Sequence, residues 1–304
     1  MDREIPPPRK VAAIGLGSMG YGMAISVLRG GHLVWGSDVD AKRAAKFRNA
    51  GGQSSNISAV ADELDAVLIV VLNAEQTENV LFGPNGLATR LSPGTVVLAC
   101  ATVPPNFAKD MARRCADIGA HYLDAPISGG SVKATEGKLT IMASGTREAF
   151  TAARPVLDRI AETVFELGVE AGAGSAMKAV NQLLAGVHIA TMAEAMTFGM
   201  TQGVAPQKFV DVISKCAGSS WMLKNRAPHI VAGDYTPHSS LNIWPKDLGI
   251  VLDIAKSAHF NAPLTAAALQ QFNAAVNMGH GWEDDAAVAK VYARNAGITL
   301  PGEE

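Results

Sequence analysis

Residues 10–20 are Lys-Val-Ala-Ala-Ile-Gly-Leu-Gly-Ser-Met-Gly, and this stretch decides the fold. The apolar run Val11–Ile14 predicts a buried strand, and the residues from Tyr21 to Arg29 have a helical composition. Between them, glycines at positions 15, 17 and 20 have the spacing GxGxxG. A strand, a glycine-rich turn and a helix in this order predict the first unit of a parallel, doubly wound α/β sheet.

The glycine-rich turn also predicts a binding site for a dinucleotide. Gly15 permits a tight turn, Gly17 lets the backbone approach a pyrophosphate, and Gly20 lets the helix pack closely. The N–H groups at the start of the helix then face the phosphates. The alternative is a turn with a structural role only. The expected cofactor-binding residues of this turn are Gly15, Leu16, Gly17, Ser18, Met19 and Gly20.

Asp38, at the end of the second predicted strand, indicates which dinucleotide is bound. An acidic side chain here can accept hydrogen bonds from the adenosine ribose and repel a 2′-phosphate, so we expect NAD. NADP stays possible, because Lys42 and Arg43 can meet a phosphate. The alternative role for Asp38 is to cap the helix that starts near Asp40.

Two polar residues follow later strands of the predicted sheet. Asn73 comes after the run Ala66–Leu72, and Thr102 comes after Thr95–Cys100. Because ligands of open α/β sheets lie outside the carboxyl ends of the strands, we expect both residues to contact the nicotinamide half of the cofactor.

Beyond this site, the chain has two halves whose sequence patterns differ. From Lys10 to about Gly168, short β-branched runs alternate with amphipathic segments, which predicts an N-terminal Rossmann domain over residues 1–170. After Gly168 the strand pattern fades, and residues 171–304 are expected to form an all-α domain. The uninterrupted segment Ser175–Gln202 predicts a long helix that joins the two.

The composition excludes several classes of protein. The chain has 304 residues and a formal charge of −2, without the basic patch of a nucleic-acid-binding protein. The start, Met1–Lys10, has charges and prolines where a signal peptide needs an apolar stretch, and the longest aliphatic run, Ala66–Leu72, is far shorter than the roughly 20 residues that span a bilayer. Three scattered cysteines and seven histidines without metal-ligand spacing predict a cytoplasmic protein with no metal and no membrane attachment.

Two further segments predict a chemical site. Residues 124–130, Asp-Ala-Pro-Ile-Ser-Gly-Gly, follow a strand and offer backbone N–H groups to an anion, although a simple glycine-rich turn explains the segment as well. Lys178 and Asn181 lie three residues apart on the predicted long helix and so share a face. The apolar Met177, Val180 and Leu184 are expected to desolvate the lysine, so that it exchanges protons near neutral pH.

Four motifs, in this order and spacing, resemble the β-hydroxyacid dehydrogenase family, which includes 3-hydroxyisobutyrate dehydrogenases. They are GLGSMG at 15–20, DAPISGG at 124–130, GAGSAMKAVN at 172–181 and KDL at 246–248. The resemblance implies that Lys178 is the catalytic acid/base. It also implies substrate binding by Ser128, Gly129, Gly130, Asn181 and Lys246, with Lys246 and Asp247 beside the nicotinamide.

The resemblance further implies a small hydroxy acid as substrate and a homodimer or homotetramer packed through the helical half. The C-terminal segments look most like the branch of the family that oxidises L-threonate. Reduction of tartronate semialdehyde and oxidation of 3-hydroxyisobutyrate are the alternatives, and a dinucleotide-sensing protein without catalysis is the alternative from another class. A polyhydroxylated substrate fits the hydroxyl and amide groups of Ser219, Ser220, Asn225, His238, Ser239 and Asn242.

Overall fold

The computed structural model describes residues 7–303, so most of the charged, proline-containing start lies outside the described residues. The chain forms two compact units, one ending at Lys178 and the other beginning at Ala179. The division falls within a single long helix, α7 (Ala173–Thr201). Each unit has its own hydrophobic core.

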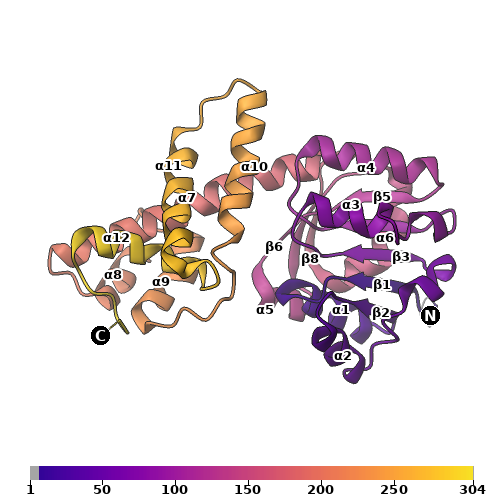
Figure 1. Ribbon diagram of the computed structural model, residues 1–304, viewed down its shortest axis with the longest axis horizontal. Helices are drawn as coiled ribbons and strands as arrows, with labels where there is room; N and C mark the ends of the chain where they lie inside the picture. The colour runs from indigo at the N-terminus through magenta and orange to yellow at the C-terminus, as the bar shows by residue number, and fades with distance from the viewer. Residues whose placement is uncertain (1–6, 304) are drawn as a thin grey trace, which may run out of the picture. The chain divides into compact units, whose positions relative to one another are not determined.

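The first unit is built on a five-stranded parallel sheet with the order β2-β1-β3-β4-β5 (Figure 1). The chain begins in the middle of the sheet, runs out to one edge, returns and continues to the other edge, as a doubly wound fold requires. Its strands are β1 (Lys10–Ile14), β2 (Leu33–Ser37), β3 (Ala66–Ile69), β4 (Val96–Ala99) and β5 (His121–Asp124).

Helices pack on both faces of this sheet because successive strand side chains point to opposite sides. Val11 and Ala13 of β1 belong to a core that includes α1 and α6, whereas Ala12 belongs to a core that includes α3 and α4. The predicted Rossmann fold is thereby confirmed. The helices are α1 (Ser18–Arg29), α2 (Ala41–Asn49), α3 (Ala74–Phe82), α4 (Pro105–Asp117) and α6 (Arg147–Ile160), with short 3-10 turns at Ile57–Ala59, Ala61–Glu63 and Ala88–Arg90.

The last strands of the unit form a separate three-stranded sheet, which the sequence pattern does not predict. In this sheet β6 pairs antiparallel to β7, and β7 pairs parallel to β8. The chain leaves β5 at Asp124 and bends at Gly129, where φ is +134°. The elements are β6 (Ile127–Ser128), α5 (Gly130–Glu136), β7 (Leu139–Ala143) and β8 (Ala161–Glu166).

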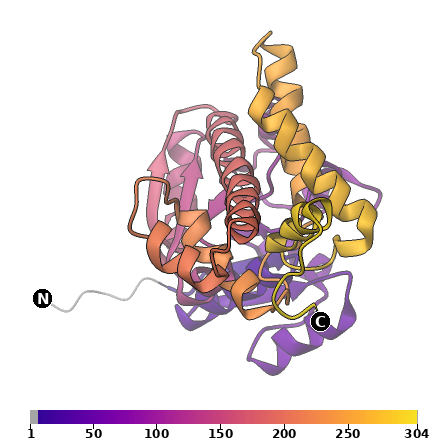
Figure 2. The ribbon, with the colours of Figure 1, turned by 90° about the vertical axis from the view of Figure 1, so that its left-hand side faces the viewer.

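The second unit is helical, and no strand occurs among the residues from 179 to 303 (Figures 1 and 2). Its core gathers apolar side chains of α7, α9, α10 and α11, and α10 packs against α11. The predicted all-α domain is thereby confirmed. The helices after α7 are α8 (Pro206–Ile213), α9 (Trp221–Ala232), α10 (Ile243–Ser257), α11 (Pro263–Ala275), a π-helical turn at Val276–His280, a 3-10 turn at Asp285–Val288 and α12 (Ala289–Ala296).

The length and hydropathy of α7 alone would allow it to cross a membrane, and among the described residues it is the one helix that meets this test. Core helices of soluble proteins meet the same test. Ile189, Met192 and Met196 of α7 lie in the core of the second unit, so the apolar character of the helix is used in packing.

The burial of His32, in the turn before β2, predicts that the protein loses stability in acid. The side chain is 6% exposed, and its Nδ1 accepts a hydrogen bond from the backbone N–H of Arg9 at 3.0 Å. Burial, together with the nearby Arg159 cation, lowers the pKa of His32 from 6.5. As the pH falls below 6.5, His32 takes up a proton in the unfolded chain but stays neutral in the folded chain until a lower pH. The free energy of unfolding therefore falls by at most about 1.4 kcal/mol per pH unit.

The test is urea denaturation of the wild type and of His32→Asn near neutral pH and about two pH units lower. An asparagine oxygen can replace Nδ1 as the acceptor but does not titrate in this range. We expect the difference in unfolding free energy between the two pH values to be smaller in the variant. Equal differences in both proteins would contradict this role of His32.

Candidate functional site

The carboxyl ends of neighbouring parallel strands bring the predicted cofactor residues to one edge of the sheet. Gly15 follows β1, Asp38 follows β2, Asn73 follows the end of β3, and Thr102 follows the end of β4. These strands are neighbours in the order β2-β1-β3-β4, so the loops that follow them lie side by side (Figure 1). This edge is where an open α/β sheet binds its ligand.

Two glycines of the turn are required by its shape. Gly15 has a φ of +88°, and a Cβ atom there would lie 2.2 Å from the carbonyl oxygen of Val70. At Gly20 a Cβ atom would lie 1.8 Å from the carbonyl oxygen of Gly15. Gly20 therefore lets α1 start directly against the turn, as expected from its place in the motif.

Gly17, unlike Gly15 and Gly20, has open space beside its Cα atom. A Cβ atom there would meet only a guanidinium nitrogen of Arg43, at 3.7 Å. Gly17 also precedes α1 without a side-chain cap, so the first N–H groups of the helix have no capping side chain. An open backbone surface at an uncapped helix start fits the pyrophosphate of a dinucleotide.

The Asp38 side chain is 5% exposed and is tied to the glycine-rich turn. Its Oδ2 accepts a hydrogen bond from the backbone N–H of Leu16 at 2.6 Å, and its Oδ1 accepts one from the N–H of Asp40 at 2.8 Å. The helix α2 is capped by Asp40 instead, which accepts a hydrogen bond from Lys42 N. The alternative role of Asp38 as the cap of α2 is therefore wrong.

Arg43 lies beside Asp38, and this arrangement predicts how the cofactor preference can be changed. Its Nη1 is 3.7 Å from Oδ2 of Asp38, and its side chain is 53% exposed. In Asp38→Asn the charge that we expect to repel a 2′-phosphate is lost while the guanidinium remains. We expect the ratio of kcat/KM for NADP to that for NAD to rise by about tenfold or more.

The matched control is Asp40→Asn, which changes a neighbouring carboxylate that caps α2. Steady-state kinetics with both cofactors should give the wild-type ratio for this control. An unchanged ratio in Asp38→Asn would show that Asp38 does not discriminate between NAD and NADP.

Asn73 and Thr102 lie where the strand pattern places them. Asn73 starts α3, and its side-chain oxygen accepts a hydrogen bond from Gln76 N at 2.8 Å. This bond holds Asn73 at the carboxyl end of β3. Thr102 lies in the segment between β4 and α4. A contact of either residue with the cofactor stays a prediction.

The segment 124–130 forms a short strand and then enters a helix. Ser128 pairs with Thr140 of β7, while Gly129 and Gly130 have φ values of +134° and +81°. A Cβ atom at Gly130 would meet nothing within 4 Å, so its backbone is not covered. The two glycines of this segment therefore form a bend at the start of α5.

Lys178 is 9% exposed, and its Nζ donates a hydrogen bond to the carbonyl oxygen of Ile127 at 2.9 Å. This bond connects α7 to the segment that carries Ser128. The expected cause of the burial is wrong, since Met177 is 44%, Val180 55% and Leu184 50% exposed. At one, two and six residues from Lys178, these side chains lie on other faces of the helix.

In the second unit, two hydrogen bonds and one ion pair connect Asn181 to Lys246. Asn181 donates to Gln182, whose Nε2 lies 2.5 Å from Oδ2 of Asp247. Oδ1 of Asp247 lies 2.6 Å from Nζ of Lys246. Gln182 was missed by the sequence analysis, although its position four residues after Lys178 puts it on the same face of the helix.

Several of the hydroxyl and amide groups expected to suit a polyhydroxylated substrate have structural partners within the second unit. Ser220 caps α9 by accepting a hydrogen bond from Leu223 N at 3.0 Å. Asn225 accepts a hydrogen bond from Arg226. The contact of His238 with the buried Asp284, at 2.9 Å, is made by the backbone N–H and not by the side chain. The contacts of Ser220 and Asn225 reduce the number of groups available to a substrate.

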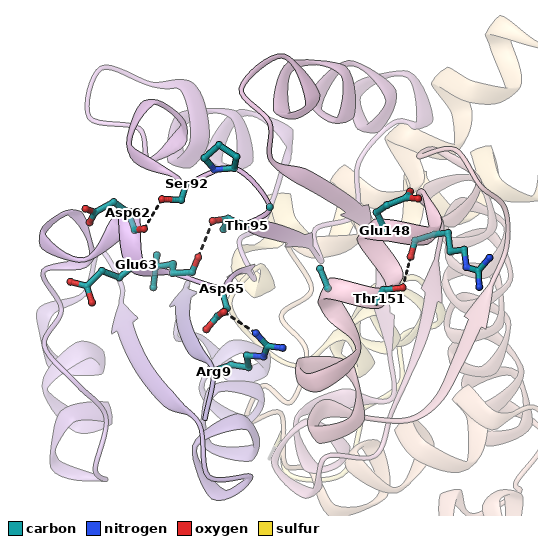
Figure 3. Close-up of a pocket in the computed structure, with 13 residues that line it drawn as sticks. Arg9, Asp62, Glu63, Asp65, Ser92, Thr95, Glu148 and Thr151 are labelled. Carbon is teal, nitrogen blue, oxygen red and sulfur yellow. Dashed lines mark hydrogen bonds and ion pairs between the residues drawn. The ribbon is translucent and has the colours of Figure 1, made fainter. Parts of the chain in front are cut away.

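A cavity of about 660 Å³ lies at the opposite end of the strands, beside their amino ends (Figure 3). It is lined by residues that precede strands, including Asp65 before β3 and Thr95 before β4. Arg9 pairs with Asp65 at 3.0 Å, and Thr95 donates to the carbonyl oxygen of Leu64 at 2.8 Å. The amino ends of parallel strands are not where such sheets bind cofactors, so this cavity is separate from the candidate site.

Within residues 7–303, no group of three or more His, Cys, Asp or Glu side chains is arranged to hold a metal ion.

The comparisons with known proteins match both halves of the chain. Residues 10–168 match the NAD binding domain of 6-phosphogluconate dehydrogenase, and residues 172–292 match the NAD-binding domain of NADP-dependent 3-hydroxyisobutyrate dehydrogenase. L-threonate dehydrogenase of Cupriavidus necator is 50% identical over 97% of this chain and 99% of the relative. L-threonate dehydrogenase of Escherichia coli K12 is 47% identical over 96% of each chain.

The solved structures include a 3-hydroxyisobutyrate dehydrogenase from Salmonella typhimurium that is 43% identical to this chain. The match has a TM-score of 0.88 and covers 93% of this chain and 99% of the other.

Proposed function

This chain belongs to the β-hydroxyacid dehydrogenase family, which includes 3-hydroxyisobutyrate dehydrogenase, and from this premise we propose that it oxidises L-threonate with NAD. The chain is an NAD(P)-dependent hydroxyacid dehydrogenase, as its relatives are. The observation that carries the substrate is the identity of 45–50%, over nearly the full length, to five relatives named L-threonate dehydrogenase. The reaction is oxidation of the 2-hydroxyl group to give 2-dehydro-L-erythronate.

Most of the residues that would hold the cofactor lie at the carboxyl ends of the strands, and Lys246 and Asp247 belong to α10 of the second unit. The turn 15–20 would hold the pyrophosphate, and Asp38 the adenosine ribose. Asn73, Thr102, Lys246 and Asp247 would contact the nicotinamide half. When bound, NAD supplies the acceptor for a hydride from the carbinol carbon.

Lys178 would act as the acid/base. In the oxidative direction its neutral amine takes the hydroxyl proton of the substrate, and in the reverse direction the ammonium returns it. The low exposure of Lys178 and its bond to Ile127 O support this role, because both hold the amine in one place. A fixed proton acceptor lowers the entropic cost of reaching the reactive arrangement.

The substrate would be held by its carboxylate and by its hydroxyl groups. The backbone of Ser128, Gly129 and Gly130 would bind the carboxylate, and the side chains of Asn181 and Lys246 would donate hydrogen bonds to the substrate. The contacts through Gln182 and Asp247, two hydrogen bonds and one ion pair, support this assignment, since they orient both donors.

The setting that we propose for the enzyme rests on its composition and on its resemblance to the family. It works in the cytoplasm on a small molecule, as a homodimer or homotetramer, without nucleic acid or membrane. Mass photometry of the purified protein would test the oligomeric state, and a monomer at all concentrations would contradict this part of the proposal.

The experiment that tests the proposed function measures reduction of the cofactor with a panel of acids. L-threonate, D-erythronate, D-glycerate and 3-hydroxyisobutyrate are compared with NAD and then with NADP. We expect the highest kcat/KM for L-threonate with NAD. A preference for D-glycerate or 3-hydroxyisobutyrate would overturn the substrate and leave the family and the fold intact.

A further inference from the structure

Asp124, the first residue of the segment 124–130, is a buried carboxylate that receives four hydrogen bonds. It is 1% exposed. Its Oδ2 accepts from the backbone N–H groups of Gly172 at 2.9 Å and Ser175 at 2.8 Å, and from the hydroxyl of Ser144 at 3.2 Å. Its Oδ1 accepts from the hydroxyl of Ser175 at 2.7 Å. The carboxylate therefore holds the first turn of α7.

The same turn of α7 is held from a second side by Ser144. The Ser144 hydroxyl accepts a hydrogen bond from the backbone N–H of Gly174 at 2.9 Å while it donates to Asp124. A Cβ atom at Gly174 would lie 2.4 Å from the carbonyl oxygen of Met142, so the helix start fits closely against β7. The hydrogen bonds to the N–H groups of Gly172, Gly174 and Ser175 thus fix where α7 begins.

The position of Lys178 depends on this arrangement. Lys178 lies three residues after Ser175, on the next turn of α7, and its Nζ donates to the carbonyl oxygen of Ile127. Ile127 lies three residues after Asp124 on the segment that continues to Ser128. One short piece of chain therefore holds both the start of the helix and the amine that the helix carries.

We propose that Asp124 is a positioning residue, which sets the height and rotation of α7 so that the Lys178 amine faces the substrate-binding segment. This inference rests on the proposed role of Lys178 as acid/base. Asp124 acts through the helix, by accepting hydrogen bonds, and does not itself touch the substrate.

The burial of Asp124 supports a specific role for the carboxylate. Burial raises the pKa of Asp124, and the hydrogen bonds from Ser175, Gly172 and Ser144 oppose this shift. A buried carboxylate costs stability unless it is fully hydrogen-bonded, so a cap on the surface would be a simpler way to start a helix. What the carboxylate adds is a rigid connection between the helix and the segment 124–130.

The experiment compares Asp124→Ala with Asp124→Asn and Ser175→Ala. Alanine removes all acceptors, whereas the asparagine oxygen can still accept from Gly172 N and Ser175 N. We expect Asp124→Ala to lower kcat by about 100-fold, as a small misplacement of a reacting group does. Asp124→Asn and the matched control Ser175→Ala, which keeps both N–H contacts, should retain kcat within about threefold.

Two readouts separate positioning from a general loss of structure. The affinity for NAD should be unchanged in all three variants, because the turn 15–20 is not part of this contact. In a double-mutant cycle, Asp124→Ala should have no further effect on the residual turnover of Lys178→Ala. If Asp124→Ala does not fold, Ser144→Ala replaces it in the same double-mutant cycle, and we expect this variant to lower kcat by about tenfold.

The outcomes are distinguishable from failure of the proposed function. The acid used is the one that the wild type oxidises fastest, so a wrong substrate does not affect the result. Near-normal kcat in folded Asp124→Ala, or an equal loss in the Lys178→Ala background, would overturn the positioning role alone. Near-normal kcat in Lys178→Ala would overturn the acid/base role and the positioning role together.

Discussion

Lys178→Ala is expected to lower kcat by about 10³-fold or more, because positioned acid/base groups contribute about 10² to 10⁴. The buried amine donates a hydrogen bond to Ile127 O, and an alanine leaves no group there to take the hydroxyl proton. Lys178→Arg should be equally inactive, since a guanidinium stays protonated and cannot act as a base. Stopped-flow and steady-state measurements of cofactor reduction would give the size of the loss.

The matched control for this prediction is Lys133→Ala. Lys133 lies on α5, has a 43% exposed side chain and pairs with Glu162 at 3.7 Å. Its removal should leave kcat within about twofold, as is usual for an exposed ion pair. The affinity for NAD should be the same in Lys178→Ala and in the wild type, and turnover near the wild-type level in Lys178→Ala would exclude it as the acid/base.

Substitutions in the glycine-rich turn are expected to have the second largest effects, and the two positions should fail in different ways. A Cβ atom at Gly17 meets only Arg43 within 4 Å, so we expect Gly17→Val to fold but to occupy the space of the pyrophosphate. We expect its Kd for NAD to rise by about 100-fold, which corresponds to about 2.7 kcal/mol. At Gly20 a Cβ atom would lie 1.8 Å from Gly15 O, so Gly20→Ala should lose about 1–3 kcal/mol of stability.

Isothermal titration with NAD and thermal unfolding separate these two effects. Gly17→Val should keep the Tm of the wild type and lose affinity for NAD. The main effect of Gly20→Ala should be a lower Tm. Wild-type affinity in Gly17→Val would show that the cofactor does not approach this turn.

Much of the fold was predictable because its determinants are local. The run Val11–Ile14, the glycines at 15, 17 and 20, and the strand and helix spacing after them set a parallel sheet through short-range rules. The long helix was predictable from its unbroken composition. The rule that ligands lie outside the carboxyl ends of the strands placed Asp38, Asn73 and Thr102 together, and the strand order in the structure agrees.

The parts that were not predicted depend on contacts distant in sequence. The second sheet arises because β6 pairs antiparallel to β7 after the bend at Gly129. Asp124 contacts Ser175, 51 residues later, so no local pattern indicates its role. The burial of Lys178 likewise comes from its contact with Ile127, and the apolar neighbours in sequence lie on exposed faces.

We expect this chain to move a hydride from the carbinol carbon of L-threonate to NAD. The most direct measurement incubates the purified protein with NAD and L-threonate that carries deuterium at carbon 2, and determines the mass of the reduced cofactor. We expect reduced cofactor that contains one deuterium, together with 2-dehydro-L-erythronate in equal amount. Reduced cofactor without deuterium, or no reduction with this acid, would contradict the claim.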